Sequence, residues 1–378
     1  MPQVNDATAR KACLVQEKIL SEIAGGVYPA DLEKETFGIV NAVKDSVKVA
    51  GVGRVDTDKL KDKPITDGAQ RLEIRYMVKR CLDSQTPNLN PCTDGENGLN
   101  PWKYAYPTMN APLYYEFTLS MGDFRSLCEG RTEHFRMLQR EAYLSLMRQM
   151  GARYASQMIA EVGKYFHPSD CTLAVDSAAA PKTLSLLDST FKPQPMGLFP
   201  LFQEYKRAGI TERPFVVGGD HLDAWNFSRT IFAGNTEGYD PNRVRNDRAY
   251  ADYQVDQAFA DGAFHLLSWA PGTVFPMEFF KYIGEFEYFS DTQTRRKFNL
   301  GAAVGAGDLF VDNSIAVVEC GEEIQMIYKY FIHSDLFFIP DDAISEACGQ
   351  CSTMILNWLT DCGELNCNIL DGFAVPVP

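Results

Sequence analysis

The sequence RTEHFRMLQREAYLSLMRQMGARYASQMIAEVGKYF, residues 131–166, holds the longest amphipathic pattern in the chain. Its apolar residues recur at intervals of three and four, the spacing that places side chains on one face of an α-helix. The pattern predicts one long helix, roughly 54 Å in length at about 1.5 Å per residue. Gly151 is expected to soften or kink its middle. The apolar face consists of Phe135, Leu138, Ala142, Leu146, Met150, Tyr154, Met158, Val162 and Phe166.

A helix with one apolar face needs a surface to cover. Residues 308–340 are rich in β-branched and aromatic residues, in two or three runs separated by polar turns. Such runs are typical of β-strands. We therefore expect the long helix to pack on a sheet formed largely by residues 308–340, which makes the fold class α+β.

The clearest strand pattern is RLEIRYMVKR, residues 71–80, in which apolar and mainly charged residues alternate with a period of two. A second alternating run, residues 113–119, follows a stretch rich in Pro, Asn and Gly. Together they predict an extended hairpin over residues 68–120. A two-stranded ribbon is marginal in water, so we expect a neighbouring copy to cover its apolar side. The residues expected at that subunit interface are Arg71, Ile74, Arg75, Tyr76, Lys79 and Arg80.

The remaining sequence predicts a smaller α/β unit and two terminal segments. A buried strand over residues 215–219 leads into a helix that Asp220 caps. The other expected elements are short helices within residues 11–48, a strand over 264–273, a short helix over 274–283 and an amphipathic segment over 343–359.

Composition excludes several classes of protein. The chain has 378 residues, is 45% hydrophobic and has a formal net charge of −14. The acidic balance argues against tight, sequence-independent binding of nucleic acid, which needs an excess of Lys and Arg. We see no signal-peptide pattern and no run of about 18 apolar residues, so we expect a cytoplasmic chain with reduced cysteines.

No constellation of catalytic residues is present. The glycine-rich stretch 301–307 fits neither the dinucleotide fingerprint nor the phosphate-binding loop, and is better interpreted as a turn. The five histidines form no zinc-hydrolase motif. Asp220 and His221 could form an acid–base pair, although a helix cap after a buried strand is the simpler interpretation. We expect no cofactor.

Four cysteines near the C-terminus, the first two with the spacing of metal ligands, are the one candidate metal site. The second pair has a wider spacing, so buried, reduced and metal-free thiols are the preferred interpretation, with a metal site and redox pairing during assembly as the alternatives. These residues are Cys348, Cys351, Cys362 and Cys367.

The expected order of elements resembles the Hong Kong 97 capsid fold of tailed bacteriophages. In that family an N-terminal arm, an extended loop, a spine helix, an axial domain and a peripheral-domain sheet follow one another. Several stretches are similar to capsid proteins of phages with Bacteroidetes-type hosts: residues 115–128, 214–219, 269–272 followed by 280–284, and 335–340. The corresponding divisions are 1–67 for the arm, 68–120 for the loop, 121–200 for spine helix and peripheral domain, 201–295 for the axial domain, 296–345 for the peripheral sheet and 346–378 for the C-terminal segment.

The resemblance implies a structural protein of the virion capsid, assembled in the host cytoplasm. Pentamers and hexamers would form an icosahedral shell around double-stranded DNA without sequence-specific binding, with scaffolding, portal and decoration proteins as possible partners. The chain departs from some family members because it shows no charged coiled-coil prodomain and no assignable cross-linking residues. Two alternatives stay open: an α/β enzyme with a site near Asp220 and His221, and a non-viral compartment shell of the same fold.

Overall fold

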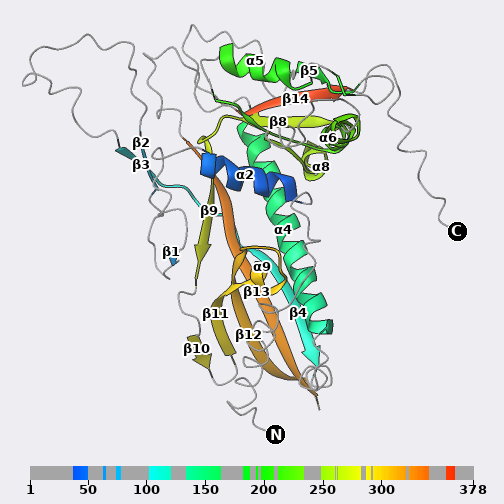
Figure 1. The fold of residues 1–378 in the computed structure, drawn as a ribbon. Coiled ribbons are helices and arrows are strands. Elements are labelled where there is room, and N and C mark those ends of the chain that lie inside the picture. Colours follow the sequence, from blue (N-terminus) through cyan, green and yellow to red (C-terminus); the bar gives the residue numbers. More distant parts are fainter. Residues whose placement is uncertain are drawn as a thin grey trace, which may run out of the picture.

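A computed structural model places the chain in segments that form two β-sheets, a separate two-stranded ribbon and the helices that cover them (Figure 1). Strands and helices are mixed, as expected. None of the helices in these segments is long and apolar enough to cross a membrane. The described residues are 37–49, 63–64, 74–77, 102–120, 133–162, 182–187, 193–194, 197–207, 212–233, 248–259, 261, 263–281, 287–290, 293–320, 323–339 and 355–361.

The larger sheet is organised around β13 (Glu323–Phe338), a strand of 16 residues. The first part of β13 pairs antiparallel with β12 (Phe310–Cys320) on one side and with β4 (Leu113–Ser120) on the other. Its last part pairs with β9 (Val274–Phe280). Beyond these strands, the sheet includes β1 (Lys63–Pro64), β11 (Gln293–Asn299) and β10 (Glu287–Ser290).

The long helix is α4 (Glu133–Glu161), a continuous helix of 29 residues. It lies along β4 and β13 and reaches the second sheet at its C-terminal end (Figure 1). Two predictions are therefore confirmed: the long helix, and its packing on a sheet whose centre is residues 308–340. The stripe that faces the sheet includes Phe135, Leu146, Met150, Tyr154 and Met158, none of which is more than 1% exposed.

Gly151 marks a close approach of another helix. A Cβ atom at this position would lie 2.4 Å from Oε1 of Gln254, the first residue of α8 (Gln254–Phe259). The short helix α8 therefore packs against α4 where α4 has no side chain, and α4 continues through the glycine as a helix.

The smaller sheet has five strands in the order β5 (Lys182–Ser185), β14 (Ile355–Asp361), β8 (His265–Trp269), β6 (Phe215–Gly218) and β7 (Ala249–Ala251). Two helices, α5 (Phe199–Arg207) and α6 (Asp220–Ala233), accompany it. Their apolar side chains share a core with the sheet, including Leu201, Tyr205, Leu222 and Trp358. The expected strand–helix unit starting at residue 215 is thus confirmed, as is the strand at 264–273.

The secondary-structure prediction for residues 274–283 was wrong. Residues 274–283 were expected to form a short helix, but β9 occupies 274–280. Nearly every residue of β9 is buried, so the alternation that identifies a half-exposed strand is missing from its sequence. The end of the expected amphipathic segment, residues 355–359, lies in β14, the second strand of the smaller sheet, and residues 343–354 lie outside the described residues.

A buried carboxylate connects the N-terminal helix α2 (Gly38–Val49) to the smaller sheet. Asp252 Oδ2 accepts the backbone N–H of Ile39 at 3.0 Å, and Oδ1 accepts that of Gln254 at 3.1 Å. One side chain therefore satisfies the free N–H groups at the beginning of both α2 and α8. Burial raises the pKa of Asp252, and the two N–H donors oppose that shift.

The glycine-rich stretch 301–307 forms a tight connection between β11 and β12, as the sequence indicated. It contains α9 (Leu300–Ala303), whose N-cap Asn299 accepts the N–H of Ala302 at 3.0 Å. Gly305 and Gly307 have φ angles of 74° and 88°, which favour glycine. A Cβ at Gly301 would lie 2.3 Å from the carbonyl oxygen of Gly307, so the turn also requires glycine for space.

We predict that Asp252→Asn lowers the free energy of unfolding by about 1–2 kcal/mol, the cost of a lost cap. An amide has one acceptor oxygen where the carboxylate has two, so either Ile39 or Gln254 loses its acceptor. Urea denaturation of the subunit measures the change. Asp308→Asn is the control, because the exposed Asp308 accepts a hydrogen bond from Asn299 and its loss should be within about 0.5 kcal/mol. Equal effects of the two substitutions would contradict the double cap.

Candidate assembly surface

The predicted hairpin takes the form of a two-stranded ribbon, with different strands from those expected. The ribbon pairs β2 (Ile74–Met77) antiparallel with β3 (Trp102–Ala105), in the register Ile74 with Ala105 and Met77 with Trp102. Residues 113–119, the expected partner of the first strand, belong to β4 and pair with β13. The hairpin pairing was therefore wrong. A ladder of eight residue pairs in a sheet covered by α4 competes successfully with an isolated ribbon.

The apolar side of β2 is covered by its own chain. Ile74 is 0% and Tyr76 3% exposed, in a cluster with Phe275, Met277 and Phe279 of β9. The reason given for expecting a neighbouring subunit here, an uncovered apolar face, was wrong. Replacing Ile74 and Tyr76 with Asp should therefore destabilise the subunit itself.

The interface role of the six predicted residues stays a prediction. Arg75 is half-buried, on the side of β2 opposite to its two buried neighbours. Arg71, Lys79 and Arg80 lie outside the described residues. The structure brings Ile74 and Tyr76 together in one cluster, and it gives no further arrangement of the set.

Three exposed tyrosines lie in the ribbon or in the segment that follows it, and the sequence analysis did not identify them. Tyr104 is 46%, Tyr106 55% and Tyr114 40% exposed, which places them among the most exposed large apolar side chains of the described segments. Tyr104 and Tyr106 are two residues apart, so extended backbone places them on the same side. Aromatic side chains of this kind are enriched in protein interfaces. The period of two in Trp102-Lys-Tyr-Ala-Tyr106 was the signal available in the sequence.

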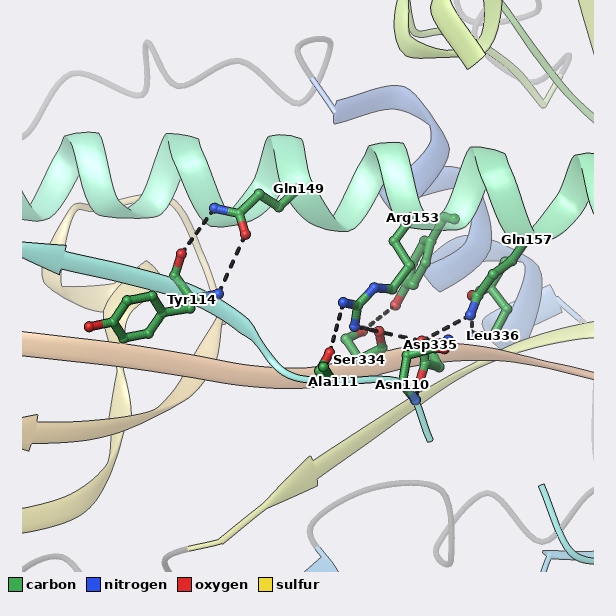
Figure 2. A network of polar contacts seen from close by, with 10 residues as sticks. Asn110, Ala111, Tyr114, Gln149, Arg153, Gln157, Ser334, Asp335 and Leu336 are labelled. Atoms are coloured by element: carbon green, nitrogen blue, oxygen red, sulfur yellow. Dashed lines mark hydrogen bonds and ion pairs between the residues drawn. The ribbon is translucent and has the colours of Figure 1, made fainter. Parts of the chain in front are cut away.

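A polar network holds the chain between the ribbon and β4 against α4 (Figure 2). Its centre is Asp335 on β13, which is 1% exposed. This carboxylate accepts the backbone N–H of Asn110 at 2.8 Å, the Asn110 side-chain amide at 3.0 Å and the Gln157 amide at 2.9 Å. Arg153 of α4 lies 3.7 Å away as an ion pair. Asp335 therefore joins the segment that follows the ribbon to α4 at one point.

Arg153 and Gln149 extend this attachment along α4. Arg153 donates to the carbonyl oxygens of Ala111 at 2.8 Å and Ser334 at 3.3 Å. One turn earlier, the Gln149 amide donates to the Tyr114 carbonyl at 3.1 Å and accepts the Tyr114 N–H at 3.4 Å (Figure 2). Gln149 thus makes the pair of backbone contacts that another strand would make at the outer side of β4.

Burial governs ionisation around the network. Burial raises the pKa of Tyr154, whose hydroxyl lies 2.6 Å from the Ser334 hydroxyl. Burial also lowers the pKa of His333, with Arg153 and Lys281 acting in the same direction and Asp335 opposing them. The neutral forms of both side chains are therefore favoured in the folded chain.

Asp220 and His221, the residues of the enzyme alternative, form the beginning of a helix. Asp220 is the first residue of α6, and its N–H donates to Asp256 at 3.1 Å. His221 is 5% exposed; its Nδ1 lies 2.9 Å from the Thr360 hydroxyl, and its ring stacks on Phe264 at 3.7 Å between centroids. The imidazole is buried against Thr360 and Phe264. Asp220 lies within the first turn of α6, after Gly219, so the expectation that Asp220 caps this helix was wrong by one residue.

No group of three His, Cys, Asp or Glu side chains suited to a metal ion occurs in the segments that the structure describes. The candidate cysteine ligands are outside those segments, so their reduced, metal-free state stays a prediction. They are Cys348, Cys351, Cys362 and Cys367.

Comparison with solved structures finds similarity to phage capsids. The mature capsid of bacteriophage PhiM1 has a TM-score of 0.38 and 11% identity, over 80% of this chain and 85% of that one. The capsid of Ralstonia phage GP4 has a TM-score of 0.38 and 10% identity, over 89% and 95%. The capsid of Myoviridae phage XM1 has a TM-score of 0.35 and 9% identity, over 88% and 99%. No protein-family model and no curated protein matches the chain.

We predict that Asp335→Asn lowers the free energy of unfolding by about 3 kcal/mol, because it removes the charge opposite Arg153 and turns an amide toward the donors of Asn110 and Gln157. Faster hydrogen exchange at the Asn110 N–H would show the local effect. Glu116→Gln is the control, since the Glu116–Lys329 pair is about one-third exposed and contributes about 1 kcal/mol or less. An unchanged Asn110 exchange rate would contradict the attachment.

We also predict a loss of stability below about pH 6.5, the ordinary pKa of His in an unfolded chain. The pKa of His333 is lowered on folding, so the unfolded state takes up a proton first as the pH falls. The contribution of His333 is fully present above this pH and declines through the window down to the lowered pKa. Between pH 7.5 and pH 5.5, the free energy of unfolding from urea denaturation should fall less for His333→Gln than for the unaltered chain. Parallel pH dependences would refute the assignment.

Proposed function

We propose that the chain is the major capsid protein of a tailed bacteriophage, a Hong Kong 97-like subunit that assembles into pentamers and hexamers. The observation that carries the proposal is the order of its elements. A ribbon, a long helix lying on a long-stranded sheet, an α/β unit and the return of the chain to the same sheet follow one another in the order that the sequence resemblance implies. This fold would suit a shell subunit, because the helix and sheet would form a stiff body and the ribbon would offer a surface for a neighbouring copy.

Assembly would use the exposed aromatic surface of Tyr104, Tyr106 and Tyr114. Tyr104 lies in the ribbon, which its own apolar cluster holds in place, and Tyr106 and Tyr114 lie on either side of Asn110, which Asp335 holds, so these side chains are presented in a fixed orientation. Preorganisation of this kind reduces the entropy lost on association. Arg71, Arg75, Lys79 and Arg80 would meet acidic surface of a neighbour and help fix its register, since the chain has a net charge of −14.

The shell would enclose double-stranded DNA without sequence-specific contacts, in the virion and after assembly in the host cytoplasm. The acidic composition supports confinement rather than tight binding. Scaffolding, portal and decoration proteins are the partners that such a shell would need. A non-viral compartment shell of the same fold is the second candidate, because the packing of α4 on β13 does not distinguish a shell that encloses DNA from one that encloses protein.

The direct test is electron microscopy and size-exclusion chromatography of the purified protein. We expect shells or ring-shaped oligomers, whereas a stable monomer under all conditions would refute a shell-forming role. Nuclease-protected double-stranded DNA inside particles isolated from infected cells would support the phage assignment, and particles enclosing protein cargo would favour the compartment.

We predict that Tyr104→Asp with Tyr106→Asp leaves the subunit folded and abolishes assembly. Both side chains are about half exposed, so their loss should change the free energy of unfolding by less than about 0.5 kcal/mol. Met137→Asp is the control, because Met137 is 54% exposed and lies near the N-terminal end of α4, outside the ribbon and the segment that follows it. Circular dichroism checks folding and electron microscopy counts particles. Normal particles from the double variant would exclude the aromatic surface from assembly.

A further inference from the structure

The contact between α4 and the larger sheet contains one polar layer within an otherwise apolar interface. Gln139 of α4 is 1%, Asn313 of β12 0% and Tyr330 of β13 0% exposed. The aromatic rings of Phe117 and Phe298 lie 5.9 and 6.1 Å from the ring of Tyr330, between centroids. Three polar side chains from three elements are thus enclosed by aromatic groups.

Strand register brings these side chains to one place. Asn313 and Tyr330 are directly opposite in the β12–β13 ladder, and Arg296 of β11 is opposite Asn313 on the next strand. Opposite residues point to the same face of a sheet, and here it is the face that α4 covers. The Tyr330 hydroxyl lies near enough to the Gln139 and Asn313 amides for both to favour its ionised form, against the larger effect of burial.

The Tyr330 hydroxyl lies close to both amides, but no hydrogen bond of good geometry joins these three side chains. The amide nitrogen and oxygen of Gln139, both polar atoms of the Asn313 side chain and the Tyr330 hydroxyl are all buried, and none has a well-formed hydrogen bond to another described residue. Five such atoms in one layer would be costly in a protein interior, where nearly every buried polar group is paired.

We propose that this layer is a binding site for ordered water, which bridges Gln139, Asn313 and Tyr330. Water is the ligand class that fits because the site contains both donors and acceptors, and water does both. An anion would accept from the amide nitrogens but leave the two amide oxygens unsatisfied. The neighbouring guanidinium of Arg296, 4.7 Å from the Phe298 ring centroid, would favour an anion. Bromide is therefore used below as a competing ligand.

The bound water would fix the position of α4 along the sheet. Apolar contacts such as those of Leu146 and Met150 are non-directional, whereas hydrogen bonds among three polar groups and their water require a particular geometry. This inference concerns the interior of one subunit and does not depend on the proposed function.

The test is a structure of the full chain at a resolution that shows ordered water, free or assembled. We expect density within about 3.2 Å of the Tyr330 hydroxyl and of at least one amide atom of both Gln139 and Asn313. Direct hydrogen bonds among the three side chains with no such density would overturn the proposal. Replacement of the density by bromide, seen through its anomalous scattering after soaking, would also overturn it by showing an anion.

Matched variants give an independent measurement. Asn313→Leu should lower the midpoint of urea denaturation, because it removes one partner of the water and leaves Gln139 and Tyr330 unsatisfied. The triple variant Gln139→Leu, Asn313→Leu and Tyr330→Phe removes every polar group of the layer, and its midpoint should fall by less than the sum of the three single changes. Purely additive changes would count against a shared water. Loss of the density in the triple variant completes the expected result.

Discussion

The packing of α4 on β13 is the interaction on which the rest of the structure depends. β13 pairs with β12 and β4 along its first part and with β9 along its last part, so it holds both regions of the larger sheet together. The apolar stripe of α4 covers this surface and continues to the smaller sheet, where Val162 bridges Ile355. Each element that departs from the sheet is therefore positioned relative to one helix–strand pair.

The sequence predicted what depends on local periodicity. The α4 stripe, the strands around residues 308–340 and the strand–helix unit at 215–233 each carry their spacing within one continuous segment. The pairing of β4 was mispredicted because we paired the two alternating runs that follow one another in the sequence. In the structure β4 pairs with β13 instead, in the part of the sheet that α4 covers. The pattern of β9 was ambiguous because both of its faces are buried.

The candidate assembly surface was harder to predict than the fold. Its attachment through Asp335 joins residues separated by 225 and 178 positions in the chain, so no local pattern announces it. Ile74 and Tyr76 were correctly recognised as an apolar pair, but alternation alone does not distinguish a face covered by the same chain from one covered by a neighbour. Exposure decides that question, and it directs attention to Tyr104 and Tyr106.

The contact of Gln149 with Tyr114 has a consequence for how copies of the chain can associate. β4 pairs with β13 on one side only, and in the described part of the chain no strand lies on its other side. An open strand edge is a template for uncontrolled growth of a sheet from molecule to molecule. The Gln149 amide is hydrogen-bonded to both the N–H and the C=O of Tyr114, so these groups at the beginning of β4 are not open to another strand. The Gln149 side chain therefore hinders the pairing of this edge of β4 with a strand of another molecule.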